Sequence, residues 1–337
     1  IDEFTGYIKI NRFASTTYSE VEDALMGLEG QGMDRLVLDF RNNGGGLLDQ
    51  AVRILDMFIS GRDTLVFTKG RISGSNEVHL SKSQNDDRNY PIIALINRGS
   101  ASASEIVSGA IQDLDRGLVL GETSFGKGLV QRQLPLESGA AVRVTIARYY
   151  TPSGRLIQRP YEDGDMAYYR ELYSTDREKK IDSLKNLRPK YKTKSGRIVY
   201  GGGGITPDIY VPYKNKINAE TAKLITNPKR PIFNFTSNYA LTFDNKFTSF
   251  DEFKNNWEVS ALTFDTFLAF LETDSIEIIQ DSILADGDYI KNRIKSELAG
   301  SIWGKNESTN IRLIYDNQVN EALKHFNEAS AFIESIN

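Results

Sequence analysis

Apolar and polar residues alternate along the first part of the chain in a way that predicts strands and helices in turn. Residues 6–13 alternate apolar and polar side chains, which is typical of a half-buried strand. Residues 17–30 carry apolar side chains at helical spacing, and residues 35–40 form a short apolar run. Strand, helix and strand in this order predict the start of an α/β domain.

The same alternation continues to about residue 150. A glycine-rich turn follows the strand at 35–40 and leads into a predicted helix over 47–59. Buried strands are predicted at 90–96 and 117–121, with a helix between them, and residues 129–149 predict a hairpin. Residues 1–150 are therefore expected to be mostly alternating β and α.

The pattern changes after residue 150. Residues 151–200 are polar and highly charged, and we interpret them as a solvated surface insertion with a short helix near 165–185. Residues 201–211 read as a flexible loop leading into a short strand. We therefore expect a core domain over 1–212 that contains this insertion.

The remaining residues, 213–337, are predicted to form a mostly helical domain of unknown role. Residues 213–247 look irregular, Ser249-Phe-Asp-Glu252 has the form of a capping box, and residues 260–300 and 308–336 read as helices.

Composition narrows the classes of function. The chain has 45 acidic and 41 basic residues, with no strongly basic region, so a nucleic-acid partner has no electrostatic support. Cysteine is absent, which excludes thiolate nucleophiles, thiolate metal sites and disulfides. The two histidines, His79 and His325, read as surface or packing residues, and two are too few for a histidine-rich zinc site.

No targeting segment is recognisable in the sequence. No apolar run is long enough to span a bilayer, and no signal-peptide pattern opens the chain. The first residues already read as the approach to a strand. We expect any targeting segment to lie upstream of this sequence.

Ser102 is the first candidate for chemistry. It lies in Gly99-Ser-Ala-Ser-Ala-Ser-Glu105, between a predicted buried strand and a predicted helix. The first N–H groups of a helix have no partner within the helix, and with the helix dipole they stabilise a negatively charged oxygen. Ser102 could therefore act as a nucleophile beside these donors. Taken alone, the three serines of this segment could equally be helix caps.

Lys127 favours the interpretation of Ser102 as a nucleophile. It lies between two glycines in the loop 121–131, after a strand that should neighbour the serine-bearing one. Lysine has an ordinary pKa of about 10.4, and burial lowers the pKa of a lysine because it disfavours the charged form. A dry, neutral lysine can take a serine proton. Gln131, four residues later, can orient the amine without adding charge. These residues predict a serine-lysine dyad.

The same loop has an alternative interpretation. Gly121 to Lys127 matches most of a nucleotide-binding phosphate loop. However, Gly128 stands where a serine or threonine should reach magnesium, and residues 129–135 predict a strand where a helix should follow. The dyad is favoured. Gly44, Gly45 and Gly46 lack dinucleotide-binding spacing, so they predict a tight turn or a backbone donor for a substrate carbonyl.

Together these segments resemble the C-terminal processing peptidases, also called tail-specific proteases. The matching stretches occur in the family's order and cover about residues 6 to 212; they are Leu38–Leu48, Gly99–Ile106, Gly121–Gln131, Tyr150–Arg155 and Gly203–Asp208.

The resemblance implies a fold and a set of roles. The implied fold is an α/β, ClpP/crotonase-like protease core, here with a helical C-terminal region. The implied nucleophile is Ser102, with Lys127 as general base and Gln131 orienting it. The backbone N–H groups of Ala103 and of a glycine of the turn, Gly45, would form the oxyanion hole. Asp113 matches an acidic position of the family and is expected to be structural.

The resemblance also implies a class of substrate, the absence of a cofactor and a cellular location. It implies cleavage of protein or peptide substrates near accessible C-termini, no metal or other cofactor, and a periplasmic or cell-envelope location. The family usually has proline at Gly44, and a substrate-binding PDZ domain upstream that this sequence does not contain. The helical region after 212 could serve assembly with itself or with an adaptor.

Two other functions stay open at this point. The chain could be a protease-derived module that holds peptide tails without cutting them, or whose site is gated. It could also be a crotonase-like acyl-CoA enzyme, since that fold is shared and glycine-turn oxyanion holes suit both chemistries. The intact Ser102, Lys127 and Gln131 favour the peptidase over both.

Overall fold

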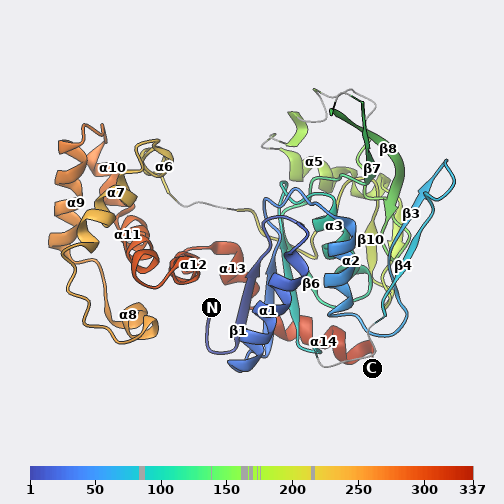
Figure 1. Ribbon diagram of the computed structural model, residues 1–337, viewed down its shortest axis with the longest axis horizontal. Coiled ribbons are helices and arrows are strands. Elements are labelled where there is room, and N and C mark those ends of the chain that lie inside the picture. Colours follow the sequence, from blue (N-terminus) through green and yellow to red (C-terminus); the bar gives the residue numbers. More distant parts are fainter. Residues whose placement is uncertain are drawn as a thin grey trace. The chain divides into compact units, whose positions relative to one another are not determined.

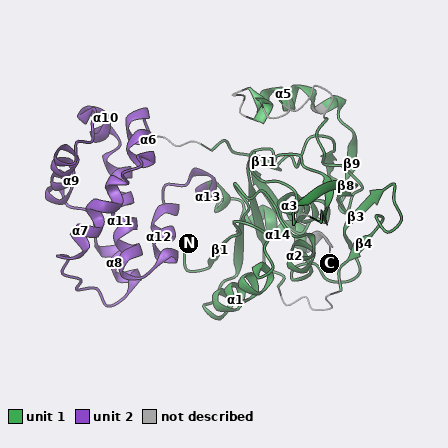
Figure 2. Cartoon of the chain, turned by 45° about the horizontal axis from the view of Figure 1, so that its top comes forward, with its two compact units in different colours: residues 1–213, 321–337 green, residues 214–320 purple. Residues whose placement is uncertain are grey.

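The computed structural model describes residues 1–82, 88–137, 139–160, 166, 170–172, 174, 176–213 and 217–336. The chain divides into two compact units (Figure 2). Unit 1 comprises residues 1–213 together with 321–337, and unit 2 comprises residues 214–320.

A five-stranded parallel sheet forms the centre of unit 1 (Figure 1). Its strands, in spatial order, are β1 (Thr5–Lys9), β2 (Arg35–Asp39), β5 (Ile92–Ile96), β6 (Leu118–Gly121) and β11 (Ile209–Tyr210). Every residue of β5 and β6 is buried. Continuous apolar strands of this kind suit a parallel sheet that is covered on both faces.

Three helices build the hydrophobic core with this sheet: α1 (Thr17–Gly30), α2 (Leu48–Asp56) and α3 (Ala103–Asp113). All 11 residues of α3 are buried, so the helix that follows Ser102 is enclosed by the domain. Further helices of this unit are α5 (Arg177–Leu184), the short 3₁₀ helix η1 (Lys185–Leu187) and α14 (Phe326–Ile336).

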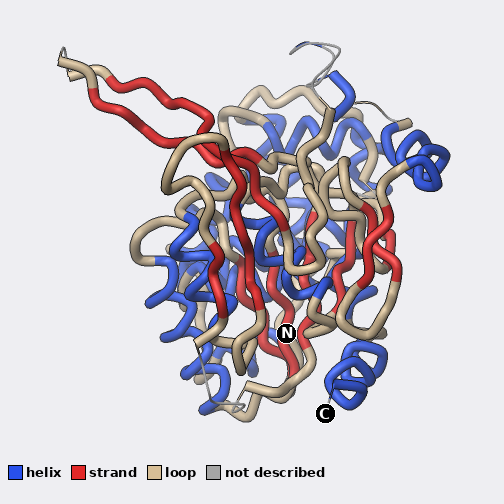
Figure 3. Tube along the Cα trace, turned by 90° about the vertical axis from the view of Figure 1, so that its right-hand side faces the viewer, coloured by secondary structure: helices blue, strands red, loops and turns tan. Residues whose placement is uncertain are grey.

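A second, antiparallel sheet has the order β4 (Val78–Leu80), β3 (Thr64–Gly70), β8 (Ala141–Tyr150) and β7 (Leu129–Pro135). The β7–β8 hairpin extends beyond the rest of the unit, at the upper left of Figure 3. Strands β9 (Lys190–Lys192) and β10 (Ile198–Tyr200) form a separate pair. The predicted α/β fold class and the hairpin are confirmed.

Unit 2 is helical throughout its described elements. These are α6 (Ala219–Thr226), α7 (Pro231–Ala240), α8 (Phe250–Asn256), α9 (Ala261–Thr273), α10 (Gln280–Ala285), α11 (Gly287–Ile302), α12 (Lys305–Leu313) and the start of α13 (Asn317–Ala322). Aromatic and aliphatic side chains form its interior, with Phe253 and Phe267 fully buried. Ser249 Oγ accepts a hydrogen bond from Glu252 N at 3.2 Å, as the capping box predicted.

The irregular structure predicted for residues 213–247 is wrong where α6 and α7 lie. Asn218 caps α6 by accepting a hydrogen bond from Thr221 N at 3.0 Å, and Pro231 stands in the first turn of α7. Proline is well suited to the first helical turn, because its missing N–H would have no partner there. Pro231 therefore starts a helix within the stretch that was predicted to be irregular.

The predicted solvated insertion at 151–200 needs a correction as well. The side chains of Arg155 and Arg177 have no exposed surface and that of Arg159 is 4% exposed. These arginines lie buried because each finds anionic partners within the unit. The predicted helix near 165–185 falls partly outside the described residues; α5 lies within that range.

Candidate active site

The candidate residues gather where three neighbouring strands of the parallel sheet end. The turn 40–47 follows β2, the segment 97–102 follows β5, and the loop 122–128 follows β6. Open parallel sheets place their ligand and catalytic sites at the carboxyl ends of the strands. The neighbouring positions of β5 and β6, predicted from the sequence, are confirmed.

Ser102 has a strained backbone immediately before α3, with φ 57° and ψ −114°. A non-glycine residue at such angles costs about 1–3 kcal/mol and persists only where its surroundings impose it. A strained serine between a strand and a helix is also the geometry that exposes the nucleophile in enzymes of the α/β-hydrolase fold. Ser102 is half-buried, whereas Ala103 is buried.

The two neighbouring serines have a different role from Ser102. Ser100 Oγ donates to Phe40 O at 2.8 Å, and Ser104 Oγ donates to Asn43 O at 2.9 Å. Both hydroxyls therefore fix the turn after β2 to the segment that carries Ser102. This contact separates the structural serines from the candidate nucleophile, which the sequence alone did not.

Glu105 connects the serine to the lysine loop, a role that was not predicted for it from the sequence. Its Oε2 accepts from Ser102 N at 2.9 Å and from Lys127 N at 2.8 Å. Its Oε1 accepts from Gly126 N at 2.7 Å and from Ser124 Oγ at 2.5 Å. The two backbone nitrogens of Ser102 and Lys127 thus share one oxygen atom.

The Glu105 carboxyl is completely buried. Burial raises the pKa of Glu105 above its ordinary value, and the four donated hydrogen bonds act in the opposite direction. A sequence signal for it existed, because a glutamate three residues after a helix-capping serine is the capping-box pattern.

Lys127 and Gln131 lie on the same loop and the strand that follows it. Lys127 is half-buried and Gln131, on β7, is exposed. Within the part of the chain that the structure describes, no hydrogen bond joins Lys127 Nζ to Ser102 Oγ or to the Gln131 amide. Glu105 thus brings the backbones of Ser102 and Lys127 together, while their side chains form no hydrogen bond with each other.

The turn after β2 approaches Ser102 at Gly45. A Cβ built on Gly45, whose φ is +95°, would lie 2.7 Å from Ala101 O, 2.7 Å from Ser102 Cβ and 2.9 Å from Ala103 N. The turn is also pinned by Asn43, whose Oδ1 accepts from Gly45 N at 2.8 Å. A glycine is required here because no side chain fits at this approach.

The two predicted oxyanion donors therefore differ in this structure. The Gly45 N–H is engaged by Asn43, whereas Ala103 N has no acceptor among the described residues. Ala103 is the first residue of α3, where an N–H lacks a helical partner. An oxyanion can approach the Ala103 N–H directly. The Gly45 N–H can bind an oxyanion only after its hydrogen bond to Asn43 Oδ1 is broken.

The remaining candidates have structural partners. Asp113 forms a buried ion pair with Arg155 at 2.7 Å, which agrees with the structural role expected for it. His79 lies 3.4 Å from Glu77, and His325 lies between Glu321 and Glu328 at 3.3 and 2.9 Å. Lys127 is followed by β7, a strand, which contradicts a nucleotide-binding phosphate loop.

Comparison with known proteins supports a peptidase. Residues 4–166 match the description of peptidase family S41, and residues 229–304 match a family of unknown function, DUF8443. The chloroplastic C-terminal processing peptidase of Tetradesmus obliquus is 38% identical over 173 residues, which cover 51% of this chain and 37% of that protein.

Two further similarities were found. The carboxy-terminal-processing protease of Bartonella bacilliformis is 44% identical over 157 residues, covering 45% of this chain and 36% of that protein. The solved structure of a photosystem II D1 C-terminal processing protease is 32% identical, with a TM-score of 0.44, over 62% of this chain and 42% of that chain. The chain thus spans little more than a third of the length of these two curated relatives.

The α/β unit, which has Ser102 immediately before α3, is similar in sequence to serine-type peptidase domains. The match to peptidase family S41 covers residues 4–166, just under half of the chain. None of its described helices is long and apolar enough to cross a bilayer.

Proposed function

We propose that this protein is a serine endopeptidase that cleaves protein substrates near their C-termini, with Ser102 as nucleophile and Lys127 as general base. The observation that carries the proposal is the shared Glu105 oxygen, which accepts hydrogen bonds from the backbone nitrogens of both residues. The names of the curated relatives support the C-terminal specificity.

The proposed reaction follows from these positions. Ser102 Oγ attacks the scissile carbonyl carbon while its proton moves to Lys127 Nζ. The Ala103 N–H and a glycine N–H of the turn stabilise the oxyanion. The lysine proton then passes to the leaving amine as the carbon–nitrogen bond breaks, which leaves an acyl ester on Ser102. Water attacks this ester, loses its proton to Lys127, and releases the new C-terminal carboxylate as the serine recovers its proton.

The open side-chain geometry is compatible with this role. Catalytic hydrogen bonds in hydrolases without substrate are often long and tighten when the substrate binds. Gln131 would orient Lys127 Nζ in the closed site. We further propose a cell-envelope location, and extended peptide tails as partners, both by analogy with the family.

The test is cleavage of an unfolded protein such as casein, with the cut sites mapped by mass spectrometry. Ser102→Ala and Lys127→Ala should each reduce kcat by at least about a thousandfold, because each removes a member of the dyad. Ser19→Ala and Lys179→Ala, both at exposed positions, are the matched controls. Turnover of wild-type size in either dyad variant would reject the assignment.

The same experiment separates the alternative functions. A tail-binding module would retain substrate without producing fragments, and an acyl-CoA enzyme would bind coenzyme A in calorimetry. Cuts clustered near the C-termini of the substrates would support the proposed specificity, whereas cuts spread along them would contradict it.

A further inference from the structure

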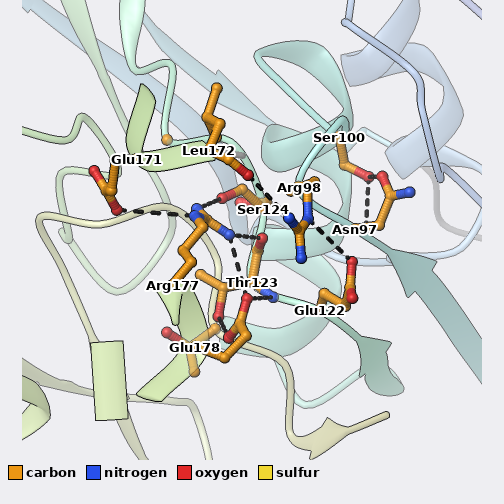
Figure 4. Close-up of polar contacts among 12 residues, drawn as sticks. Asn97, Arg98, Ser100, Glu122, Thr123, Ser124, Glu171, Leu172, Arg177 and Glu178 are labelled. Atoms are coloured by element: carbon orange, nitrogen blue, oxygen red, sulfur yellow. Dashed lines mark hydrogen bonds and ion pairs between the residues drawn. The ribbon is translucent and has the colours of Figure 1, made fainter. Parts of the chain in front are cut away.

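The polar insertion places an arginine against the loop that carries the candidate base. Arg177, the first residue of α5, has no exposed side-chain surface. Its Nη1 donates to Thr123 O and its Nη2 donates to Ser124 O, each at 2.6 Å (Figure 4). A planar guanidinium can serve two adjacent carbonyls at once, which a lysine amine cannot do in the same geometry.

The next residue of α5 binds the same short segment from another side. Glu178 Oε2 accepts from Thr123 Oγ1 at 2.8 Å, and its Oε1 accepts from Thr123 N at 3.2 Å. Glu178 also pairs with Arg177 Nη1 at 3.3 Å. The first turn of α5 therefore engages the N–H, the carbonyl and the hydroxyl of Thr123 (Figure 4).

A second arginine of the insertion contacts the loop nearer to Lys127. Arg159 N donates to Gly126 O at 3.1 Å, and its guanidinium lies over the Phe125 ring at 5.1 Å. Glu171 joins the two arginines, with distances of 2.7 Å to Arg159 Nη1 and 3.8 Å to Arg177 Nε. The insertion thus holds the loop at Thr123–Ser124 and again at Gly126.

The held segment connects directly to the candidate site. Ser124 Oγ donates to Glu105 Oε1 at 2.5 Å, and the other oxygen of Glu105 binds the backbone of Ser102 and Lys127. Thr123 and Ser124 are fully buried. The placement of Lys127 relative to Ser102 therefore depends on a loop whose outer side is bound by α5.

We propose that Arg177, assisted by Glu178, is a positioning residue for the reaction of Ser102 and Lys127: it clamps the loop between β6 and β7 in the geometry the dyad needs. The catalytic part of this inference rests on the proposed function. The clamp itself is a statement about the loop and can be tested without turnover.

The experiment compares Arg177→Gln and Arg177→Lys with Lys179→Gln, which removes a positive charge at an exposed position of the same helix. We expect kcat of both Arg177 variants to fall at least about tenfold with KM within about twofold, since positioning affects the transition state more than binding. Arg177→Lys should resemble Arg177→Gln. Methylguanidine should restore part of kcat to Arg177→Ala and none to Ser102→Ala.

Amide hydrogen exchange provides the independent readout. In Arg177→Gln the amides of Gly126 and Lys127 should exchange at least about tenfold faster, while those of β5 keep the wild-type rate. The inference is overturned if kcat and exchange in Arg177→Gln match those of Lys179→Gln, or if all amides accelerate equally.

Two outcomes need separate treatment. Where circular dichroism shows that the Arg177 variants are unfolded, Glu178→Ala decides by the same two measurements, because it removes the other two hydrogen bonds between α5 and Thr123. A lower kcat with faster exchange at Gly126 and Lys127 supports the clamp, and wild-type values overturn it. A wild-type chain that cleaves no peptide refutes the proposed function alone, and exchange in Arg177→Gln then decides the clamp: faster exchange supports it, and unchanged exchange overturns it.

Discussion

Gly45 is a position of the candidate site that leaves no room for a side chain. Its positive φ and the 2.7 Å approach to Ala101 O and Ser102 Cβ exclude any side chain. We expect Gly45→Ala to lower the free energy of unfolding by about 2 kcal/mol and to abolish peptide cleavage, because the turn must move away from Ser102. Urea denaturation and a casein assay measure the two effects.

The preceding glycine supplies the control. A Cβ on Gly44 would meet no atom within 4 Å, and its φ is not positive. Gly44→Ala should therefore keep stability and activity close to those of the wild type. Equal losses in both variants would show that the turn tolerates no substitution at all, and that the approach of Gly45 to Ser102 is not the cause.

At the residue scale, the sequence singles out the candidate nucleophile and base but not the residues that hold their backbones in place. Ser102 and Lys127 could be selected because few residue types can serve as nucleophile and base in a chain without cysteine and with two histidines. The shared oxygen of Glu105 could not be predicted, since it binds backbone N–H groups that every residue has. The same is true of Asn43, which occupies the N–H of Gly45.

At the scale of elements, Asp39 joins the end of β2 to its surroundings. It accepts from Tyr7 OH of β1 at 2.6 Å and pairs with Arg41 at 2.7 Å and Lys9 at 3.2 Å. Burial opposes ionisation of Asp39, but Arg41, Lys9 and the Tyr7 hydroxyl outweigh it and hold the pKa of Asp39 below its ordinary value.

Asp39→Asn should lower the free energy of unfolding by about 3 kcal/mol at pH 7, because it removes the buried carboxylate that pairs with the Arg41 guanidinium. Because the pKa of Asp39 is lower in the folded state, its carboxylate stabilises the folded protein at pH values above the unfolded-state pKa of about 3.9. This stabilisation is lost as the pH falls through the folded-state pKa. The difference between variant and wild type should therefore shrink below about pH 4. Urea denaturation from pH 3 to 7 measures it.

Asp34→Asn is the matched control, since this aspartate is exposed just before β2. It should leave stability nearly unchanged across the same range. A difference between Asp39→Asn and wild type that grows toward low pH would contradict the assigned role of the carboxylate.

The elements themselves divide into predictable and unpredictable ones. β2, β5 and β6 were predicted because continuous apolar runs have few alternatives in an α/β chain. The role of α5 was missed because Arg177 binds carbonyl oxygens, which leave no trace in a sequence, and a buried arginine looks like any other charge in a polar stretch. Helices α6 and α7 were missed because they are only 8 and 10 residues long, so a helical pattern has little length in which to repeat.

At the scale of the whole molecule, the chain returns to unit 1 after unit 2. Residues 321–337 are grouped with residues 1–213, whereas the sequence had suggested a single boundary near 212. Phe326, at the start of α14, is 4% exposed and lies beneath the Arg35 guanidinium of β2 at 5.3 Å. The last helix is therefore part of the folding unit that contains the candidate site.

We expect Phe326→Ala to lower the free energy of unfolding of unit 1 by about 3 kcal/mol, because it leaves a cavity beneath Arg35. Both tryptophans, Trp257 and Trp303, lie in unit 2, so their fluorescence follows that unit alone. Loss of cleavage activity should therefore shift to lower urea while the fluorescence transition stays in place. Phe233→Ala, at a 39% exposed position of unit 2, is the control. A parallel shift of both transitions would contradict this assignment of α14.

This interrupted course of the chain has a consequence during translation. A ribosome that has completed residue 213 must still add all of unit 2 before it reaches α14. At about 5–20 residues per second, that interval lasts roughly 5–20 s. The nascent peptidase unit lacks its final helix throughout this delay, so it exposes the surface beneath Arg35 to chaperones. Unit 1 can therefore be completed only after unit 2 has been synthesised, whatever the folding rate of the sheet.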